Sequence, residues 1–595
     1  MRSLKTYLLV ALLVACNSTQ LSPEAVSTLA AGSSRLSEFF ASYWEENLQV
    51  YPTMATSLGD LRYNDQYPNY DSAEFRTEDK SRTTRHLAEI GNINRDELSG
   101  QDLLSYDIFV RSQQQYLDSF RFPDWLMPVD QYNDHNRFMR LGSGSSYQPF
   151  STVQHYEDWF NRLGRLVIST DTQIANMKLG IDRGYSQPTI IMKKVVDQYD
   201  GFVVENVEDS PLWKSITDMP DSISQPERER LTLEYRELLS ESVMPAYKRM
   251  RDYLRDEYQP KCRETVGMLD LPDGKAWYNY HVKRHTTTDL TVEEIHQFGL
   301  SEVKRLHNQM QQVMTKVGFD GGLHEFFSFL QADEQFYFDS EAELFAAYEA
   351  KREEVGKLLP KAFDIFPKAG FEIRPVESFR NRTASGASYR RASPDGSKPG
   401  VFYINTYDLK AAPKYRVETL YLHEAEPGHH FAGSIQRELQ GLPAFRRFGG
   451  YTAYSEGWAL YVETTGKELG LFTDPYMYYG ALDAQLFRAM RLVVDTGIHY
   501  YGWTRNQAIE YMSTNSSMAG TKIESEVERY ISRPGQALSY KIGQREIRQM
   551  RQRAEAVLGD NFDLKAFHRE VLIDGALPMD VLGSKIDRWI ESKRG

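Results

Sequence analysis

Three histidines and two glutamates fall within the ten residues Tyr421-Leu-His-Glu-Ala-Glu-Pro-Gly-His-His430, in a chain that has only thirteen histidines. A His-Glu pair with a second histidine four residues after the first is the zinc-hydrolase pattern HExxH, in which both imidazoles bind the metal and the glutamate acts on its water. Here Pro427 stands four residues after His423, so the regular pattern is interrupted. The stretch predicts a metal site if the chain brings a later histidine back beside the first.

Two histidines compete for the place of second ligand. In a regular helix His429 lies about 240° around the axis from His423, and His430 lies about 10 Å along it, so neither pairs with His423 without distortion. Pro427 cannot donate a backbone hydrogen bond, and Gly428 permits unusual backbone angles. If these two residues are an insertion, the remainder His-Glu-Ala-Glu-His ends at His429. A helix that is merely kinked would favour His430 instead, so both stay candidates.

A third protein ligand is expected on the next long helix, because zinc in hydrolases usually has three protein ligands and a position for water. In Tyr454-Ser-Glu-Gly-Trp-Ala-Leu-Tyr-Val-Glu463, two acids share one face of a largely apolar helix. An acid in such a place is costly unless it is paired or bound to metal. Glu456 is the preferred ligand, and Glu463 is expected to support the site from behind or to form an ion pair.

Two further groups of residues could act beside the metal. Arg491, Asp495 and His499 recur at four-residue intervals on one predicted helix, so Asp495 could hold both neighbours while His499 binds or polarises substrate. Ordinary salt bridging would give the same pattern. Tyr540 stands just inside a helix start, one turn after Gln536, and its phenol could donate to the oxyanion that develops in amide hydrolysis. An ordinary core or surface tyrosine is the alternative.

The elements that must position these residues are predicted to be mostly helices. Apolar residues at spacings of three and four indicate long helices, and a capping box at Thr291-Val-Glu-Glu294 opens one that runs to Val317. One strand is expected at Val401 to Asn405, after a run rich in turn residues. The other helices are predicted at Tyr156 to Gly184, Pro226 to Tyr258, Tyr454 to Gly466, Gly480 to Tyr501, Arg505 to Met512 and Gln536 to Leu558.

Composition is typical of a globular protein with a large core, since 41% of the 595 residues are hydrophobic. The formal net charge is −13, and the basic residues are scattered along the chain. A nucleic-acid partner would require a clustered basic face. The sequence therefore argues against nucleic-acid binding.

The N-terminus predicts export and lipidation. A basic start is followed by an apolar run that is too short to span a bilayer, which indicates a signal peptide over residues 1–15. Leu13-Val-Ala-Cys16 resembles the bacterial lipobox, so Cys16 is expected to carry the lipid and residues 16–35 to form a tether. By the same resemblance, Asn17 implies the outer membrane of a Gram-negative cell, facing the periplasm. An ordinary signal peptide with a chance cysteine is the alternative. Only Cys262 remains, so no intramolecular disulfide is expected in the lipidated chain.

Four motifs together resemble a known family over most of the mature chain, the bacterial domain-of-unknown-function 885 proteins. They are HEAEPGHH (423–430), SEGWALYVE (455–463), RLVVDTGIHYYGW (491–503) and RPGQALSYKIG (533–543). Members of the family look like the zincin-like helical peptidases typified by angiotensin-converting enzyme and neurolysin. The resemblance implies one large, mostly α-helical domain over residues 36–595. It also implies two lobes, roughly 36–285 and 286–595, around a deep channel, with a small β element near the active site.

The resemblance also implies roles for single residues. One zinc ion would be bound by His423, one of His429 and His430, and Glu456, with Glu424 as general base and Tyr540 as oxyanion partner. The strand at 401–405 would lie above the metal and hold an extended peptide by strand addition. The residues expected around substrate are Tyr403, Asn405, Glu463, Arg491, Asp495, His499 and Gln536.

The function expected from these observations is a lipid-anchored zinc peptidase that acts on peptide substrates. Two alternatives stay open at the level of sequence. One is metal-dependent hydrolysis of non-peptide amides or esters, because no motif specifies the substrate. The other is a non-catalytic lipoprotein that binds peptides or cell-wall fragments and keeps a relict metal site.

Overall fold

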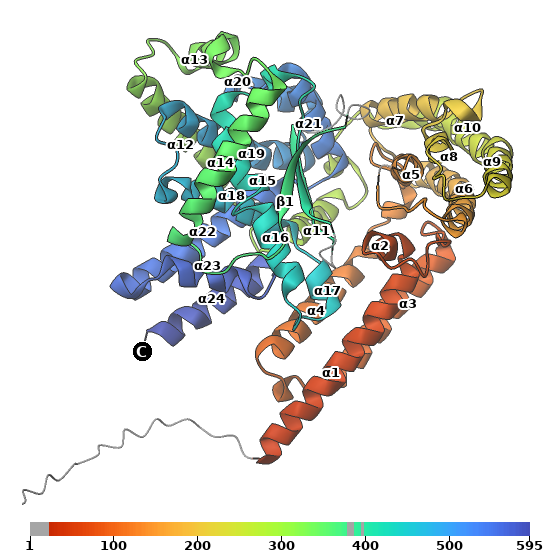
Figure 1. Ribbon diagram of the computed structural model, residues 1–595, viewed down its shortest axis with the longest axis horizontal. Helices are drawn as coiled ribbons and strands as arrows, with labels where there is room; N and C mark the ends of the chain where they lie inside the picture. Colours follow the sequence, from red (N-terminus) through yellow and green to blue (C-terminus); the bar gives the residue numbers. More distant parts are fainter. Residues whose placement is uncertain (1–22, 145, 378–385, 394–397, 595) are drawn as a thin grey trace, which may run out of the picture.

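The computed structural model describes residues 23–144, 146–377, 386–393 and 398–594 (Figure 1). The chain is mostly helical, as expected, and has one small three-stranded sheet. The predicted signal peptide and the predicted lipidation site Cys16 lie outside the described residues. Within the described ranges, no helix is long and apolar enough to cross a membrane.

The chain is helical over much of the predicted tether, because helix α1 begins at Pro23 and continues to Val50. Residues 23–35 of the predicted tether are thus helical, and the role of residues 16–35 as a tether stays a prediction. Proline is well tolerated in the first turn of a helix, and the alanines and leucine that follow favour helix. Leu36 and Phe40 of α1 pack with Ile90 and Phe109 of the next helices. Helix α1 is thereby packed against the folded body from Leu36 onward.

The first half of the chain contains helices that Figure 1 draws from red to yellow. The predicted helix at 156–184 is found as α6, and the predicted helix at 226–258 is found as α9 and α10, which are linked and extended by π-helical turns at 239–243 and 253–258. The helices of this half after α1 are α2 (Pro52–Ser57), α3 (Ala73–Gly91), α4 (Gly100–Ser119), α5 (Asp134–Gly142), α6 (Val153–Asp182), α7 (Thr189–Phe202), α8 (Lys214–Thr217), α9 (Gln225–Leu238), α10 (Met244–Asp252) and α11 (Gly274–Thr286).

The second half begins with the helix whose capping box the sequence predicts. The Thr291 hydroxyl accepts from the backbone N–H of Glu294, and the Glu294 carboxylate accepts from the N–H of Thr291, which confirms that prediction. The helices of this half are α12 (Val292–Lys316), α13 (Leu323–Ala332), α14 (Glu341–Leu358), α15 (Val417–Glu424), α16 (His429–Glu438), α17 (Ala444–Phe448), α18 (Thr452–Leu469), α19 (Pro475–His499), α20 (Arg505–Asn515), α21 (Gly520–Ser532), α22 (Leu538–Leu558), α23 (Leu564–Leu572) and α24 (Met579–Lys593).

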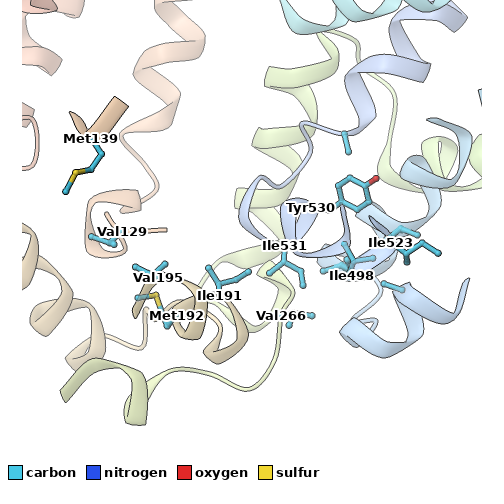
Figure 2. Close-up of a cluster of buried hydrophobic side chains, with 14 of the residues drawn as sticks. Val129, Met139, Ile191, Met192, Val195, Val266, Ile498, Ile523, Tyr530 and Ile531 are labelled. Atoms are coloured by element: carbon cyan, nitrogen blue, oxygen red, sulfur yellow. The ribbon is translucent and has the colours of Figure 1, made fainter. Parts of the chain in front are cut away.

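One buried cluster joins the two halves. Figure 2 shows Ile191 and Val195 of α7 in the same cluster as Ile498 at the end of α19 and Ile531 of α21. Apolar side chains that share a core resist separation because water would have to enter between them. The helices that follow residue 285 are thus packed against those before it. The division into lobes at that residue stays a prediction.

The sheet consists of β1 (Phe371–Pro375), β2 (Ala387–Arg390) and β3 (Gly400–Ile404) in the order β1-β3-β2. The predicted strand is found as β3, which pairs in parallel with β1 and antiparallel with β2. Because β3 is the central strand, its backbone groups are already bonded on both sides. The prediction that it holds a peptide by strand addition is therefore wrong, since strand addition requires an open edge. The edge strands are β1 and β2.

Candidate metal centre

The His-Glu stretch forms two helices separated by a short break. Helix α15 ends at Glu424, Ala425 leaves helical geometry with φ −101° and ψ −102°, and α16 starts at His429. The break contains Pro427, whose carbonyl accepts a hydrogen bond of 2.8 Å from the indole N–H of Trp458 on α18. This bond attaches the break to the helix that carries Glu456.

Glycine is required at position 428 by a close backbone approach. A Cβ atom at Gly428 would lie 1.9 Å from the carbonyl oxygen of His423 and 2.3 Å from that of Leu422. Only a residue without a side chain lets the chain pass so close to the end of α15. The reversal it permits starts a new helix beside the old one, which returns His429 to His423.

His423, His429 and Glu456 come together at this point. Their candidate ligand atoms all lie within 4.8 Å of one another. Oε2 of Glu456 is 3.3 Å from Nε2 of His429 and 3.7 Å from Nε2 of His423. The two imidazole rings stand nearly perpendicular, with centroids 4.7 Å apart. Two nitrogens and one carboxylate oxygen therefore converge from three different helices.

This donor set fits zinc. Zinc takes imidazole nitrogen and carboxylate oxygen at about 2.0–2.2 Å in a tetrahedron, which separates neighbouring ligand atoms by about 3.3–3.6 Å. The 3.3 Å distance from Glu456 to His429 lies within that range, and the 3.7 Å distance to His423 lies just above it. Two histidines and one glutamate also leave the fourth position that a hydrolytic site needs for water. The residues present are thus able to hold one zinc ion.

Charges within the cluster attract one another. Burial opposes a charge on Glu456, but nearby His429 lowers the pKa of that carboxyl to about 2. Burial likewise opposes a charge on His429, but Glu456 raises the pKa of its imidazole above the usual value. The site is therefore arranged to hold positive charge between these two side chains.

Behind His423 lies a second carboxylate. Nδ1 of His423 is 2.7 Å from Oε1 of Glu463, which is 1% exposed. If Nδ1 carries the proton and donates it to Glu463, Nε2 keeps its lone pair on the side of Glu456. This is the tautomer that a metal ligand needs. The guanidinium of Arg488 is 3.9 Å from the same carboxylate oxygen. Glu463 thus has the supporting position that the sequence suggests.

Glu424 follows His423 at the end of α15, and in the described part of the chain it makes no hydrogen bond to another side chain. Burial raises the pKa of its carboxyl to about 7, against the opposing effect of His429. A carboxylate beside a metal position, and not committed to a structural bond, is placed to exchange protons with a bound water.

His430 faces away from the cluster. Its Nδ1 is 2.8 Å from the hydroxyl of Tyr389 on β2, and its ring centroid is 4.6 Å from that of Phe371 on β1. Burial lowers the pKa of this imidazole to about 4. The structure therefore places His430 against the sheet, where it links α16 to two strands, and leaves His429 as the histidine beside His423.

The three residues expected to act together on α19 do not form the predicted pairs. Asp495 accepts from the hydroxyl of Tyr278 at 2.6 Å and from the backbone N–H of Gly535, and burial raises its pKa to about 7. His499 is fully buried, with Nδ1 bonded to the N–H of Met268 and Nε2 to the carbonyl of Tyr530. The prediction that His499 contacts substrate is therefore corrected, because both of its nitrogens are used by backbone groups.

Arg491 turns toward α21 instead of pairing with Asp495. It donates to the hydroxyl of Tyr530 at 3.1 Å and to Glu526 at 3.2 Å. Its guanidinium also lies 4.5 Å from the centroid of the Tyr540 ring. Tyr540 is half-buried in the first turn of α22, and the turn before that helix is held by the bond from Gly535 to Asp495. Asp495 thus positions the helix that carries Tyr540.

The remaining residues expected around substrate have structural contacts. Gln536 accepts from the guanidinium of Arg529. Tyr403 lies on the central strand β3, in a small apolar cluster with Val376 and Val401. Asn405 donates its backbone N–H to Gly386, and its side chain accepts from the N–H of Tyr407.

Sequence reasoning missed two residues that shape the site. Trp458 lies in the SEGWALYVE motif and could have been noticed as an indole donor amid apolar neighbours. Arg488 precedes Arg491 by one turn in an apolar helix, and that spacing was the available signal.

Comparison with known proteins shows the family. Residues 52–586 match the family model described as "Bacterial protein of unknown function (DUF885)". Because the match covers most of the chain, this protein belongs to that family. None of the curated proteins matches it.

Two solved structures are similar to this one. The first is described as "The crystal structure of the putative lipoprotein from Colwellia psychrerythraea", with 29% sequence identity and a TM-score of 0.86 over 94% of this chain and 99% of that one. The second is described as "The structure of a putative lipoprotein of unknown function from Shewanella oneidensis", with 17% identity and a TM-score of 0.74 over 92% of this chain and 99% of that one. At 17% identity, the similarity to the second structure shows a shared fold and no more.

Proposed function

We propose that this protein is an exported, lipid-anchored metallopeptidase that hydrolyses peptide bonds at the His423, His429 and Glu456 cluster. The observation that carries the proposal is the convergence of these three ligand groups within 4.8 Å, with Glu424 beside them. A bound zinc ion would supply Lewis acidity and lower the pKa of a water molecule. The anchor would be Cys16, in keeping with the similar structure from Colwellia psychrerythraea, which is described as that of a "putative lipoprotein".

The residues of the chain divide the remaining work. Glu424 takes a proton from the attacking water and delivers it to the leaving amine, as a positioned carboxylate does in general acid–base catalysis. Glu463 fixes the orientation of His423 through the 2.7 Å hydrogen bond to Nδ1. Tyr540 donates its phenol to the oxyanion, and Arg491 beneath its ring adds positive charge.

An edge strand is available for substrate. Among the described residues, strand β2 pairs with β3 alone, and its Tyr389 contacts His430, the residue that follows His429. An extended peptide added to the open side of β2 would run close to α16. In the proposed mechanism β2 therefore has the role that the sequence had suggested for β3.

The test is a metal analysis combined with a peptide digest. Purified protein should bind one zinc ion per chain and cleave members of a mixed peptide library. Glu424→Gln should keep the zinc and lose at least about a hundredfold in kcat, because general-base catalysis typically contributes 10²–10⁴-fold. Glu426→Gln is the matched control, since Glu426 is two residues away and bonds to Tyr421 at 3.4 Å.

The outcomes separate the rival functions. Undiminished cleavage by Glu424→Gln would refute the mechanism. Stoichiometric zinc with turnover of small esters or amides, but of no peptide, would indicate a hydrolase of another substrate class. Persistent absence of metal, with peptide binding intact, would indicate a non-catalytic binding protein.

A further inference from the structure

Helices α19 and α21 hold three cations around one aromatic ring. The ring is that of Phe487, whose centroid lies 4.2 Å from the guanidinium carbon of Arg491 and 5.6 Å from the ammonium of Lys522. Arg488, the residue after Phe487, lies 5.5 Å from the same centroid. Cations at such distances are attracted by the ring but are not neutralised by it.

The carboxylates nearby do not balance these charges. Glu526 is shared, since both Arg491 and Arg529 lie 3.2 Å from its Oε2. Arg491 is 4% exposed, and its Nη1 has no hydrogen-bond partner among the side chains and backbone that the structure describes. Lys522 forms no ion pair with any described residue. Positive charge is therefore in excess around Phe487.

Arg488 connects this group to the metal centre. Its Nη2 is 3.9 Å from Oε1 of Glu463, but that oxygen is already bonded to Nδ1 of His423 at 2.7 Å. Its Nε is buried, again with no partner in the described ranges. The Arg488 guanidinium can therefore donate further hydrogen bonds. Glu463 lies between it and the predicted metal ligand His423.

Lys522 lies near a further cation, Arg416. Although Lys522 is exposed, crowding by nearby protein atoms and, after it, the charge of Arg416 lower the pKa of its ammonium group to about 8. Arg416 itself is bonded to Asp483, so that carboxylate is already engaged by another cation.

A group of partly dehydrated cations with too few carboxylates is costly unless an anion binds there. Guanidinium and ammonium donors on one wall complement a carboxylate, which accepts several charge-assisted hydrogen bonds. We propose that Arg488, Arg491 and Lys522 form a subsite for a substrate carboxylate next to the metal centre. That carboxylate is either the C-terminus of a peptide or an acidic side chain. Its role in choosing peptides for cleavage rests on the proposed function, whereas binding itself does not.

The test measures binding before cleavage. Zinc-loaded protein carrying Glu424→Gln, which preserves the peptide, is titrated by calorimetry with acetyl-pentaalanine as free acid, with its C-terminal amide, and with an amide in which one alanine is replaced by glutamate. The free acid or the glutamate peptide should bind at least tenfold more tightly than the neutral amide, as a charge-assisted bond requires. The peptide that gains affinity identifies the source of the carboxylate.

Substitutions at Lys522 then locate the effect. Lys522→Met should remove the tenfold preference, while Lys522→Arg should retain it. Lys248→Met, at an exposed lysine on α10, should leave it unchanged. Equal binding of acid and neutral peptides, or no binding of either carboxylate peptide at about 1 mM, would overturn the subsite.

Cleavage data distinguish this proposal from the one on which it rests. With Glu424 intact, Lys522→Met should raise KM for the carboxylate peptide and leave kcat within about twofold, because uniform binding affects KM alone. Discrimination in binding without any cleavage would support the subsite and refute the peptidase. Equal cleavage of the free-acid peptide and its amide would support the peptidase and refute the subsite.

Discussion

The imidazole of His423 lies between two carboxylates of one helix, Glu456 and Glu463. Nδ1 meets Glu463 at 2.7 Å, and Nε2 is 3.7 Å from Glu456, two turns earlier on α18. One helix therefore supplies both a candidate ligand and the support for another. The geometry of α18 thus controls the tautomer and the direction of His423.

Replacing Glu463 should weaken metal binding without abolishing it. Glu463→Gln keeps an acceptor for Nδ1 but removes the charge, and changes to such supporting groups typically cost 10–100-fold in metal affinity. Competition with a fluorescent zinc chelator would measure the dissociation constant. Glu468→Gln, at an exposed glutamate of the same helix, serves as control. An unchanged dissociation constant would contradict the supporting role.

The two histidines at 429 and 430 should behave differently. His429→Ala should lose zinc on dialysis, since it removes one of three protein ligands. His430→Ala should keep one zinc per chain but lose about 1–3 kcal/mol of stability, because it leaves the hydroxyl of Tyr389 without its buried partner. Zinc content and urea unfolding of both variants check this. Loss of zinc from His430→Ala alone would reverse the assignment.

A methyl group at position 428 should disrupt the centre. Gly428→Ala places a Cβ 1.9 Å from the carbonyl oxygen of His423, so the backbone must move, at an expected cost of about 2 kcal/mol or more. Gly433→Ala is the matched control on α16, where the nearest atom would be 3.7 Å away. Thermal unfolding and zinc content should fall together in the first variant only. Equal stability of the two would disprove the close approach.

Buried histidines should make the fold sensitive to acid. His568 is fully buried between the hydroxyl of Tyr461 and the carbonyl of Ala362, and burial lowers its pKa to about 3. Its pKa in the unfolded chain is about 6.5, so as pH falls from about 6.5 toward 3 the unfolded state binds the proton first. Stability is therefore lost toward low pH, by up to about 1.4 kcal/mol per pH unit from this group.

The pH dependence can be isolated with a variant. His568→Asn should be less stable than the wild type at pH 7 but lose less stability between pH 7 and pH 5. His324→Asn, at an exposed position on α13, should follow the wild-type curve. Urea midpoints at several pH values measure the difference. Parallel curves for wild type and His568→Asn would rule out this contribution.

Local patterns were sufficient for several of the long helices. The capping box at Thr291 and the regular apolar spacing in α6 and α18 depend on residues a few positions apart, and a helix is built from such short-range bonds. The reasoning that Pro427 and Gly428 interrupt one helix and start another also depends on local chemistry. The candidate ligands His423, His429 and Glu456 could be identified from sequence because they stand in short motifs.

Contacts distant in sequence decided the rest. Asp495 accepts a hydrogen bond from the backbone of Gly535, and His499 is hydrogen-bonded to the backbone of Met268 and Tyr530. Strand β3 lies between two strands that gave no clear sequence signal. Lys522 resembles any lysine of an amphipathic helix until α21 packs on α19. The sequence by itself determined which residues could bind a metal and where several long helices lie, such as α6, α12 and α18. Only the tertiary structure decided which way each side chain faces, because that depends on partners that the chain brings together from hundreds of residues away.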